Sequence, residues 1–203
     1  MLNQVRLALA VFCAVPVLAV QPPSQPHTQV TAVVIPDGRY SRVAIGAMGR
    51  EAAHILKKSG VSLLWRVGDP GQSVDGMIVV VKLVGRCDMD GPAAAILMTG
   101  PLGWSHEANG VVLPFSDLAC DNIRGQVQSA QVAGNPLRGN VLLGRAMGRV
   151  LAHELYHIVA DTSKHADDGV TQSALSAREL TSGQLEFRTS DVEAMQNGLR
   201  QGR

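Results

Sequence analysis

Apolar runs of strand length recur along the chain, and most of them are rich in β-branched residues. The run at residues 77–84 opens with five consecutive apolar residues, a pattern typical of a strand that is buried on both faces. We therefore expect this strand in the centre of a sheet. Further strands are predicted at residues 30–35, 61–67 and 111–115, and a short one at residues 93–98.

Other segments space their apolar residues close to the helical period. In residues 41–58, Ser41 is placed to cap the start of a helix and Gly60 follows its end. Residues 141–160 form the longest periodic segment of the chain. A short helix is predicted within residues 117–132, and a last helix is predicted to start with Thr189 as its cap; residues 134–140 and 161–183 are expected to be loops.

This order of elements predicts one mixed α/β (α+β) domain. The order is strand, helix, two or three strands, long helix, loop and final helix. We expect a mixed, mostly parallel sheet of four to five strands, with the long helix and a C-terminal helix beside it.

The first residues differ in character from the rest of the chain. A charge-free apolar run follows Arg6, and it has the length of a signal-peptide core but is short for a membrane span. Val17-Leu18-Ala19 offers small residues for cleavage, so residues 1–19 are predicted to be a signal peptide, with a retained membrane anchor as the alternative. Residues 20–29 are expected to be a flexible tail and residues 30–203 a single domain. The mature protein is then secreted or periplasmic, without stable membrane association.

Charge and cysteine content narrow the possible partners. The 18 Lys and Arg residues include Arg6, so the mature chain keeps 17 against 17 Asp and Glu, which argues against nucleic acid or an anionic membrane as the partner.

Cys87 and Cys120 remain after residues 1–19 are removed, and in an oxidising compartment we expect them to form one disulfide. Closing a loop of about 34 residues would stabilise the fold by about 3–4 kcal/mol.

The long helix carries the sequence His153-Glu154-Leu155-Tyr156-His157. Histidines four residues apart lie one turn apart on the same helix face, where both imidazoles can bind one tetrahedral zinc ion at about 2 Å. Glu154 then lies beside the metal without reaching it, and it can take a proton from an activated water and pass one to the leaving amine. The alternative, two histidines on a helix surface, fits this mostly apolar segment less well.

A third protein ligand is expected after the helix. Seven residues separate His165 from His157, which is far enough for the chain to leave the helix and turn back toward the metal. Asp161 on the next helical turn and Glu179 on a second helix are the alternatives. We favour His165 because imidazole suits zinc and residues 161–164 have turn chemistry.

These residues resemble the metzincins, the zinc peptidase clan with the motif H-E-x-x-H-x-x-G-x-x-H. The end of the chain resembles the matrix metalloprotease catalytic domain, in which a third histidine leads to a tight turn, a loop and a short helix that begins near an aspartate. Here His165, Gly169-Val170-Thr171-Gln172 and Thr189-Ser190-Asp191 stand in those places. The resemblance implies a zincin or metzincin-like fold and a Zn²⁺ cofactor held by His153, His157 and His165, with Glu154 as the general base.

The chain also departs from the family. The family has five residues between its second and third histidines, and Ala160 occupies the place of its glycine, so the turn after the helix must be built differently. The methionine beneath the zinc is missing, with Thr171 at the closest position. Arg86-Cys87-Asp88 resembles the inhibitory cysteine switch of matrix metalloprotease propeptides, but its place inside the domain favours the disulfide.

The sequence therefore predicts a zinc metalloendopeptidase that acts as a monomer on a peptide or protein substrate. Trp104-Ser105-His106 precedes a strand, residues 111–115, that is expected to edge the cleft and to pair with extended substrate. A non-catalytic zinc-binding or interaction domain and a zinc amidase acting on cell-wall peptide are the alternatives. Glu154 favours hydrolysis over the first of these, because holding zinc does not require it.

Overall fold

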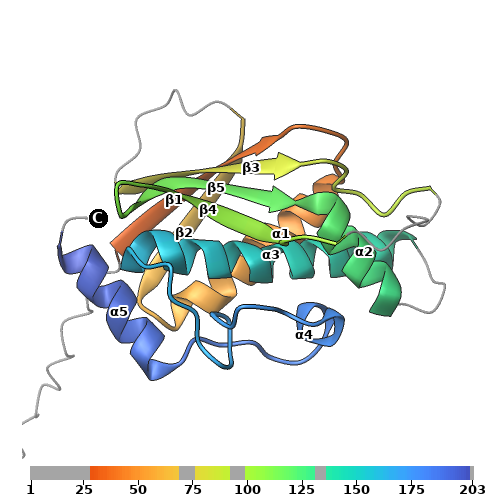
Figure 1. The fold of residues 1–203 in the computed structure, drawn as a ribbon. Coiled ribbons are helices and arrows are strands. Elements are labelled where there is room, and N and C mark those ends of the chain that lie inside the picture. The colour runs from red at the N-terminus through yellow and green to blue at the C-terminus, as the bar shows by residue number, and fades with distance from the viewer. Residues whose placement is uncertain (1–27, 69–75, 92–98, 131–135, 202–203) are drawn as a thin grey trace, which may run out of the picture.

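The computed structural model describes residues 28–68, 76–91, 99–130 and 136–201 (Figure 1). Its sheet has five strands in the order β2-β1-β3-β5-β4, as predicted for a mixed sheet with residues 77–84 at its centre. The parallel strands are β1 (Thr28–Pro36), β2 (Val61–Val67), β3 (Met77–Val84) and β5 (Val111–Ala119), and the antiparallel edge strand is β4 (Gly103–Ala108). The predicted signal peptide, residues 20–27 of the predicted tail and the predicted strand at residues 93–98 lie outside the described residues.

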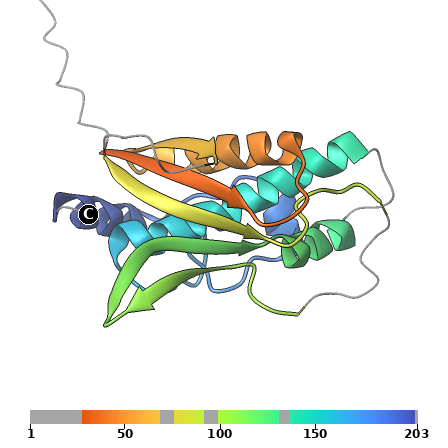
Figure 2. The same ribbon diagram turned by 90° about the horizontal axis from the view of Figure 1, so that it is seen from above.

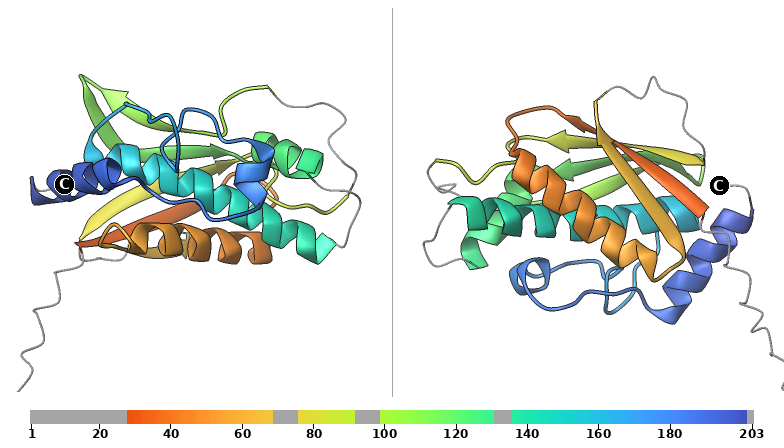
Figure 3. Two further views of the ribbon diagram at one scale, coloured as in Figure 1. Left: turned by 90° about the horizontal axis from the view of Figure 1, so that it is seen from below. Right: turned by 180° about the vertical axis from the view of Figure 1, so that it is seen from behind.

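Helices lie beneath one face of this sheet (Figures 1 and 2). The described residues form α1 (Arg42–Lys57), α2 (Cys120–Ala130), α3 (Pro136–Ala160), α4 (Ala177–Thr181) and α5 (Thr189–Arg200). α1 and α3 run side by side under the strands, and the segment that carries α4 and α5 covers α3 from the other side (Figure 3). In the part of the chain that the structure describes, no helix has the length and apolar character needed to cross a membrane.

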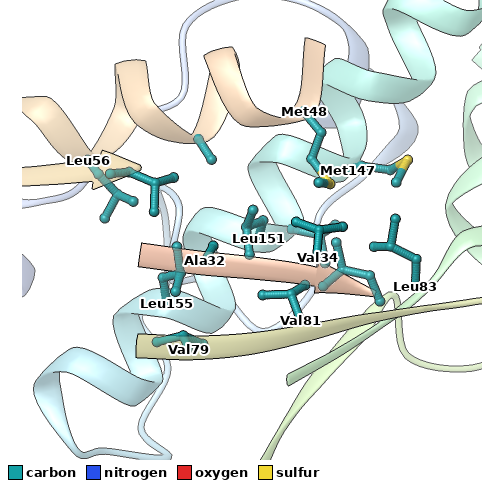
Figure 4. Close-up of a cluster of buried hydrophobic side chains, with 14 of the residues drawn as sticks. Ala32, Val34, Met48, Leu56, Val79, Val81, Leu83, Met147, Leu151 and Leu155 are labelled. Atoms are coloured by element: carbon teal, nitrogen blue, oxygen red, sulfur yellow. The ribbon is translucent and has the colours of Figure 1, made fainter. Parts of the chain in front are cut away.

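The core fills the space between the sheet and the pair α1 and α3 (Figure 4). Burying each large apolar side chain here contributes about 1.5–3 kcal/mol. α3 approaches α1 closely because it has glycines where the helices cross: a Cβ on Gly148 would lie 2.6 Å from the carbonyl oxygen of Met48. The core side chains that meet in this layer include Ala32, Val34, Met48, Leu56, Val79, Val81, Leu83, Met147, Leu151 and Leu155.

The segment after α3 is fastened to the helix by a buried arginine. Arg149, only 2% exposed, donates from Nε to Glu51 Oε1 of α1 at 2.9 Å. Its guanidinium also donates to the carbonyl oxygens of Ser182 at 2.8 Å and Gly183 at 2.7 Å. The chain that follows α4 is therefore held against the same helix face that carries the two histidines one and two turns further on.

Several element boundaries differ from the sequence-based expectations. α3 begins at Pro136, so most of the predicted loop at residues 134–140 is helical; proline is tolerated there because a first-turn N–H has no partner within the helix. α5 begins at Thr189, so Arg188 is its N-cap, and Asp191 Oδ2 accepts the Arg188 N–H at 3.1 Å. α4 lies inside the predicted loop at residues 161–183, where Ser176 caps it.

The edge of the sheet also differs from the expectation. β4, which contains Trp104-Ser105-His106, forms the edge next to the long helix, and β5 lies one place further in. β4 is a short strand whose side chains are mostly exposed. It therefore forms because it pairs with β5, and not because of a local apolar pattern.

The predicted disulfide is present between Cys87 and Cys120. It joins the segment that follows β3 to the first residue of α2. Because the Cys87 sulfur is bonded in this way and the residue is only 1% exposed, it does not take the place of a metal-binding cysteine switch.

Candidate metal centre

His153 and His157 lie on the buried face of α3, and each is oriented by a main-chain carbonyl. His153 Nδ1 donates to the Val170 oxygen at 2.8 Å, and His157 Nδ1 donates to the Thr162 oxygen at 2.6 Å. Both accepting residues follow α3 in the chain, so the loop that continues the helix fixes the rings that the helix carries. Hydrogen bonds of this kind select the tautomer of a metal-binding histidine and hold its ring in place.

Burial also keeps both rings neutral. Desolvation lowers the pKa of His153 to about 4, against the opposing effect of the Val170 hydrogen bond, and it lowers the pKa of His157 in the same direction. A neutral imidazole that carries its hydrogen on Nδ1 has only a lone pair on Nε2. Both Nε2 atoms are therefore acceptors near neutral pH.

These two lone pairs face each other, because His153 Nε2 and His157 Nε2 are only 2.9 Å apart. Neither atom has a hydrogen to donate, so the arrangement is unfavourable unless a cation lies between them. Two nitrogens bound to one tetrahedral zinc at about 2.0 Å lie about 3.3 Å apart, a few tenths of an ångström from the observed separation. The donor set fits a transition metal such as zinc, for which imidazole is a preferred ligand.

His165 joins this pair from the loop. One nitrogen of each of the three histidines lies within 4.8 Å of the others. The ring of His165 is 5.1 Å from that of His153 and 4.8 Å from that of His157, measured between centroids. Unlike the other two, His165 is exposed to solvent. The structure thus brings together the three predicted ligands; their binding of a metal stays a prediction.

The turn that brings His165 back differs from the family's glycine turn, as expected from Ala160. Asp161 adopts the left-handed conformation with φ of 49°, and the Thr162 N–H donates to the His157 carbonyl at 3.1 Å. This is the hydrogen bond that ends many helices with a glycine, with Asp161 in the glycine's place. The Asp161 carboxylate accepts the N–H of Val112 at 2.9 Å, which ties the turn to β5.

The two alternative third ligands lie elsewhere. Asp161 directs its carboxylate to Val112 as just described, and Glu179 accepts the N–H and the hydroxyl of Ser176, at 2.9 Å and 2.6 Å, in the cap of α4. These hydrogen bonds, the hydroxyl's above all, lower the pKa of Glu179. Neither acid belongs to the histidine cluster found among the described residues.

A second set of hydrogen bonds holds Thr171, the residue closest to the position of the family's methionine. We call Thr171 and its partner Asp191 the floor below the cluster. The Thr171 hydroxyl donates to Asp191 Oδ2 at 2.8 Å, and the Thr171 carbonyl accepts the Ala166 N–H at 2.9 Å. Thr171 is fully buried and Asp191 is 3% exposed. α5 thereby supports the residue next to Val170, whose carbonyl orients His153.

Glu154 lies next to the cluster in a cleft of about 500 Å³. Burial raises the pKa of its carboxyl to about 7, although hydrogen bonds from the Ser105 hydroxyl and main chain act to lower it. The cleft is bordered by β4, α3 and the chain between the described residues 162 and 175. A carboxyl group whose pKa is close to neutral pH can both accept a proton and return it.

Sequence reasoning missed the part of this site that β4 supplies. Ser105 donates from Oγ to Glu154 Oε2 at 2.8 Å, across 49 positions of the chain, and no local spacing relates the two residues. Tyr156, between the two histidines in the sequence, lies in the core with its ring 5.4 Å from that of His157. His106 is exposed and pairs with Asp117, and His54 is exposed on α1.

Comparisons with known proteins support the fold. No family model and no curated protein matches the chain. Among solved structures, the chain is similar to archaemetzincin (AmzA) from Methanopyrus kandleri, with a TM-score of 0.53 and 12% sequence identity; the match covers 88% of this chain and 99% of that chain. At this identity the likeness concerns the fold, which is therefore metzincin-like, as predicted. The finer resemblance to matrix metalloproteases stays a prediction.

Proposed function

We propose that this protein is a zinc-dependent metallopeptidase. The observation that carries the proposal is the pair of facing Nε2 lone pairs of His153 and His157, with His165 beside them and Glu154 in the adjoining cleft. The metzincin-like fold supports the same function, since the solved structure that it resembles is named as an archaemetzincin.

The chemistry divides between the metal and the protein. Zinc, when bound, supplies a Lewis acid that polarises the scissile carbonyl and makes water nucleophilic at neutral pH. His153, His157 and His165 would hold it, and the Val170 and Thr162 carbonyls keep the first two rings in place. Glu154 takes the proton of the attacking water on its carboxylate and returns it to the leaving amine. Its burial in the cleft gives it a pKa of about 7, which favours transfer in both directions.

A peptide is the substrate class that the cleft fits best. Among the described strands β4 forms the edge of the sheet, and its residues border the cleft, so we expect an extended chain to pair with its main chain. Apolar residues that include Leu102, Val150 and Leu175 line the cleft and would receive an apolar side chain. The Cys87–Cys120 disulfide supports an oxidising compartment, in agreement with a secreted or periplasmic protein.

The test combines metal analysis with one conservative substitution. Purified protein should contain about one zinc per chain, and Glu154→Gln should keep the zinc while losing cleavage by more than about 100-fold. The probes are fluorescein-labelled casein and a mixture of internally quenched peptides. Glu193→Gln, the same change on the exposed face of α5, is the matched control and should keep full activity.

Three outcomes would overturn the proposal. Unchanged cleavage by Glu154→Gln would remove the mechanism, because no other group in the proposal moves the proton. Zinc retention with no cleavage of any probe by the unaltered protein would favour the non-catalytic zinc-binding domain. Cleavage of a cell-wall stem peptide, with casein left intact, would favour the amidase.

A further inference from the structure

β4 presents two small residues to α3 at the level of Glu154. Ser105 Oγ lies 2.8 Å from Glu154 Oε2 and 3.2 Å from the Glu154 main-chain oxygen, so its single hydrogen is donated toward this one residue. Gly103, two positions earlier on the same face of the strand, has no side chain. A Cβ there would lie 3.0 Å from Glu154 Oε1 and 2.8 Å from Val150 Cγ1. The two positions therefore accommodate one oxygen of the carboxylate each.

The two oxygens of Glu154 are in different surroundings as a result. Oε2 accepts the Ser105 hydroxyl, whereas Oε1 borders the space that Gly103 leaves open, and both Gly103 and Glu154 line the cleft. Glu154 is only 4% exposed, so water offers little compensation for a missing hydrogen bond to its carboxylate. A glutamate has three side-chain torsions, the last of them broad, so packing around its stem does not fix the plane of the carboxylate.

The strand that carries Ser105 is itself fixed. β4 pairs with β5, and the register shifts between Ser105 and Glu107, which interrupts the regular ladder directly after the serine. Ser116 of β5, opposite Ser105, donates its hydroxyl to the Trp104 carbonyl at 3.2 Å. A register shift such as the one after Ser105 can re-aim a side chain next to a site. Ser105 is thus held at the edge of the sheet with its hydroxyl directed at α3.

We propose that Ser105 is a positioning residue for Glu154: its hydroxyl holds Oε2 and so leaves Oε1 as the oxygen that exchanges the proton with water and the leaving group. The inference rests on the proposed function. It assigns to the edge strand a role in placing the base, in addition to its main-chain pairing with substrate. Ser105 itself makes no contact with the reacting atoms in this proposal.

The kinetic test compares three serine variants of the zinc-loaded protein on one quenched peptide that the unaltered protein cleaves. Ser105→Ala should lower kcat by about 10- to 100-fold, the cost of a misplaced catalytic group, while KM and zinc content stay the same. Ser105→Thr keeps the hydroxyl and should restore most of the rate. Ser116→Ala removes the hydroxyl that anchors β4 without touching Glu154, and it should lower kcat much less.

Two results in this comparison would overturn the proposal. If Ser116→Ala loses as much as Ser105→Ala, the effect comes from loosening of β4. If Ser105→Ala raises KM and leaves kcat alone, Ser105 binds substrate and does not position the base.

A double-mutant cycle supplies a readout that does not need activity. Unfolding midpoints in urea are measured on metal-free Ser105→Ala, Glu154→Gln and the double variant at pH 8. Contacting residues give non-additive effects, so the shift caused by Ser105→Ala should differ between the protein that keeps Glu154 and the Glu154→Gln variant, and strictly additive shifts would refute the contact. The same cycle on kcat should show no further loss from Ser105→Ala once Glu154 is replaced.

The two proposals can fail separately. Full activity of Glu154→Gln removes the peptidase mechanism whatever Ser105 does. Loss of activity in Glu154→Gln together with full activity of Ser105→Ala leaves the peptidase proposal intact and removes only the role of Ser105.

Discussion

The cluster is built from two unlike regions, a helix that carries two histidines and a loop that carries the third. On α3, helical spacing alone brings His153 and His157 to one face, and two main-chain carbonyls orient the rings. His165 has no such spacing rule: its place depends on the left-handed turn at Asp161 and on the bridge between Ala166 and Gln172. The pair is buried, and the third ring faces solvent.

This difference predicts that the two regions contribute unequally to zinc affinity. The helix pair is buried and main-chain carbonyls orient its rings, so losing either ring removes a ligand that water cannot easily replace. The loop histidine completes the set from the solvent side, where water can take its place. We therefore expect graded consequences when the two regions are altered.

Replacing a helix ligand should have the largest effect. His157→Ala removes one of the two facing nitrogens, and we expect zinc affinity to fall by about 1,000-fold. Competition with a fluorescent chelator measures the affinity. Zinc binding equal to that of the unaltered protein would show that the facing lone pairs are not the metal site.

Replacing the loop ligand should have a smaller but still large effect. His165→Ala should weaken zinc binding by about 100-fold, because water can occupy the position on the exposed side. Asp161→Ala and Glu179→Ala are the matched tests of the alternative ligands and should leave zinc binding nearly unchanged. If one of these acids proves more important than His165, the assignment of the third ligand is wrong.

The floor below the cluster should have a more modest influence. Thr171→Val keeps the shape of the side chain but removes one of the donors to the buried Asp191 carboxylate, which should cost about 1.5–3 kcal/mol in urea unfolding of the metal-free protein. Zinc affinity should fall by about 3- to 10-fold, since the Val170 carbonyl that orients His153 is one residue away. Thr181→Val, which removes a hydroxyl bond within α4, is the control and should change zinc binding by less.

The turn at Asp161 should affect stability more than zinc. Both Asp161→Ala and Asp161→Gly lose the bond to Val112, but alanine keeps a Cβ in the left-handed conformation and glycine does not. The alanine variant should therefore be less stable than the glycine variant by about 1 kcal/mol. Zinc affinity of Asp161→Gly should match the unaltered protein, and equal stability of the two variants would argue against the strained turn.

The sequence predicts the helix that carries His153 and His157 better than it predicts the loop that carries His165. The strand at residues 77–84 has a strong continuous apolar signal and the long helix has a strong periodic one. Once that helix forms, the spacing of His153 and His157 is enough to place both rings on one face. The periodic pattern places the start of α3 too late because Gly134 and Gly139 flank Pro136, a composition that also suits a loop.

Ser105 could not be predicted, because its contact with Glu154 arises only when β4 pairs with β5 and α3 packs beneath them. Likewise, the sequence left Asp161, Glu179 and His165 open as third ligands. Their separation in space depends on hydrogen bonds to Val112 and Ser176 that no spacing reveals.

The most direct test of the central claim is anomalous diffraction at the zinc absorption edge from crystals of the purified protein. The account predicts one zinc peak at about 2.0–2.1 Å from Nε2 of His153, Nε2 of His157 and a ring nitrogen of His165. A crystal grown with zinc that shows no peak at these nitrogens, or a peak bound through Asp161 or Glu179 in place of His165, would contradict it.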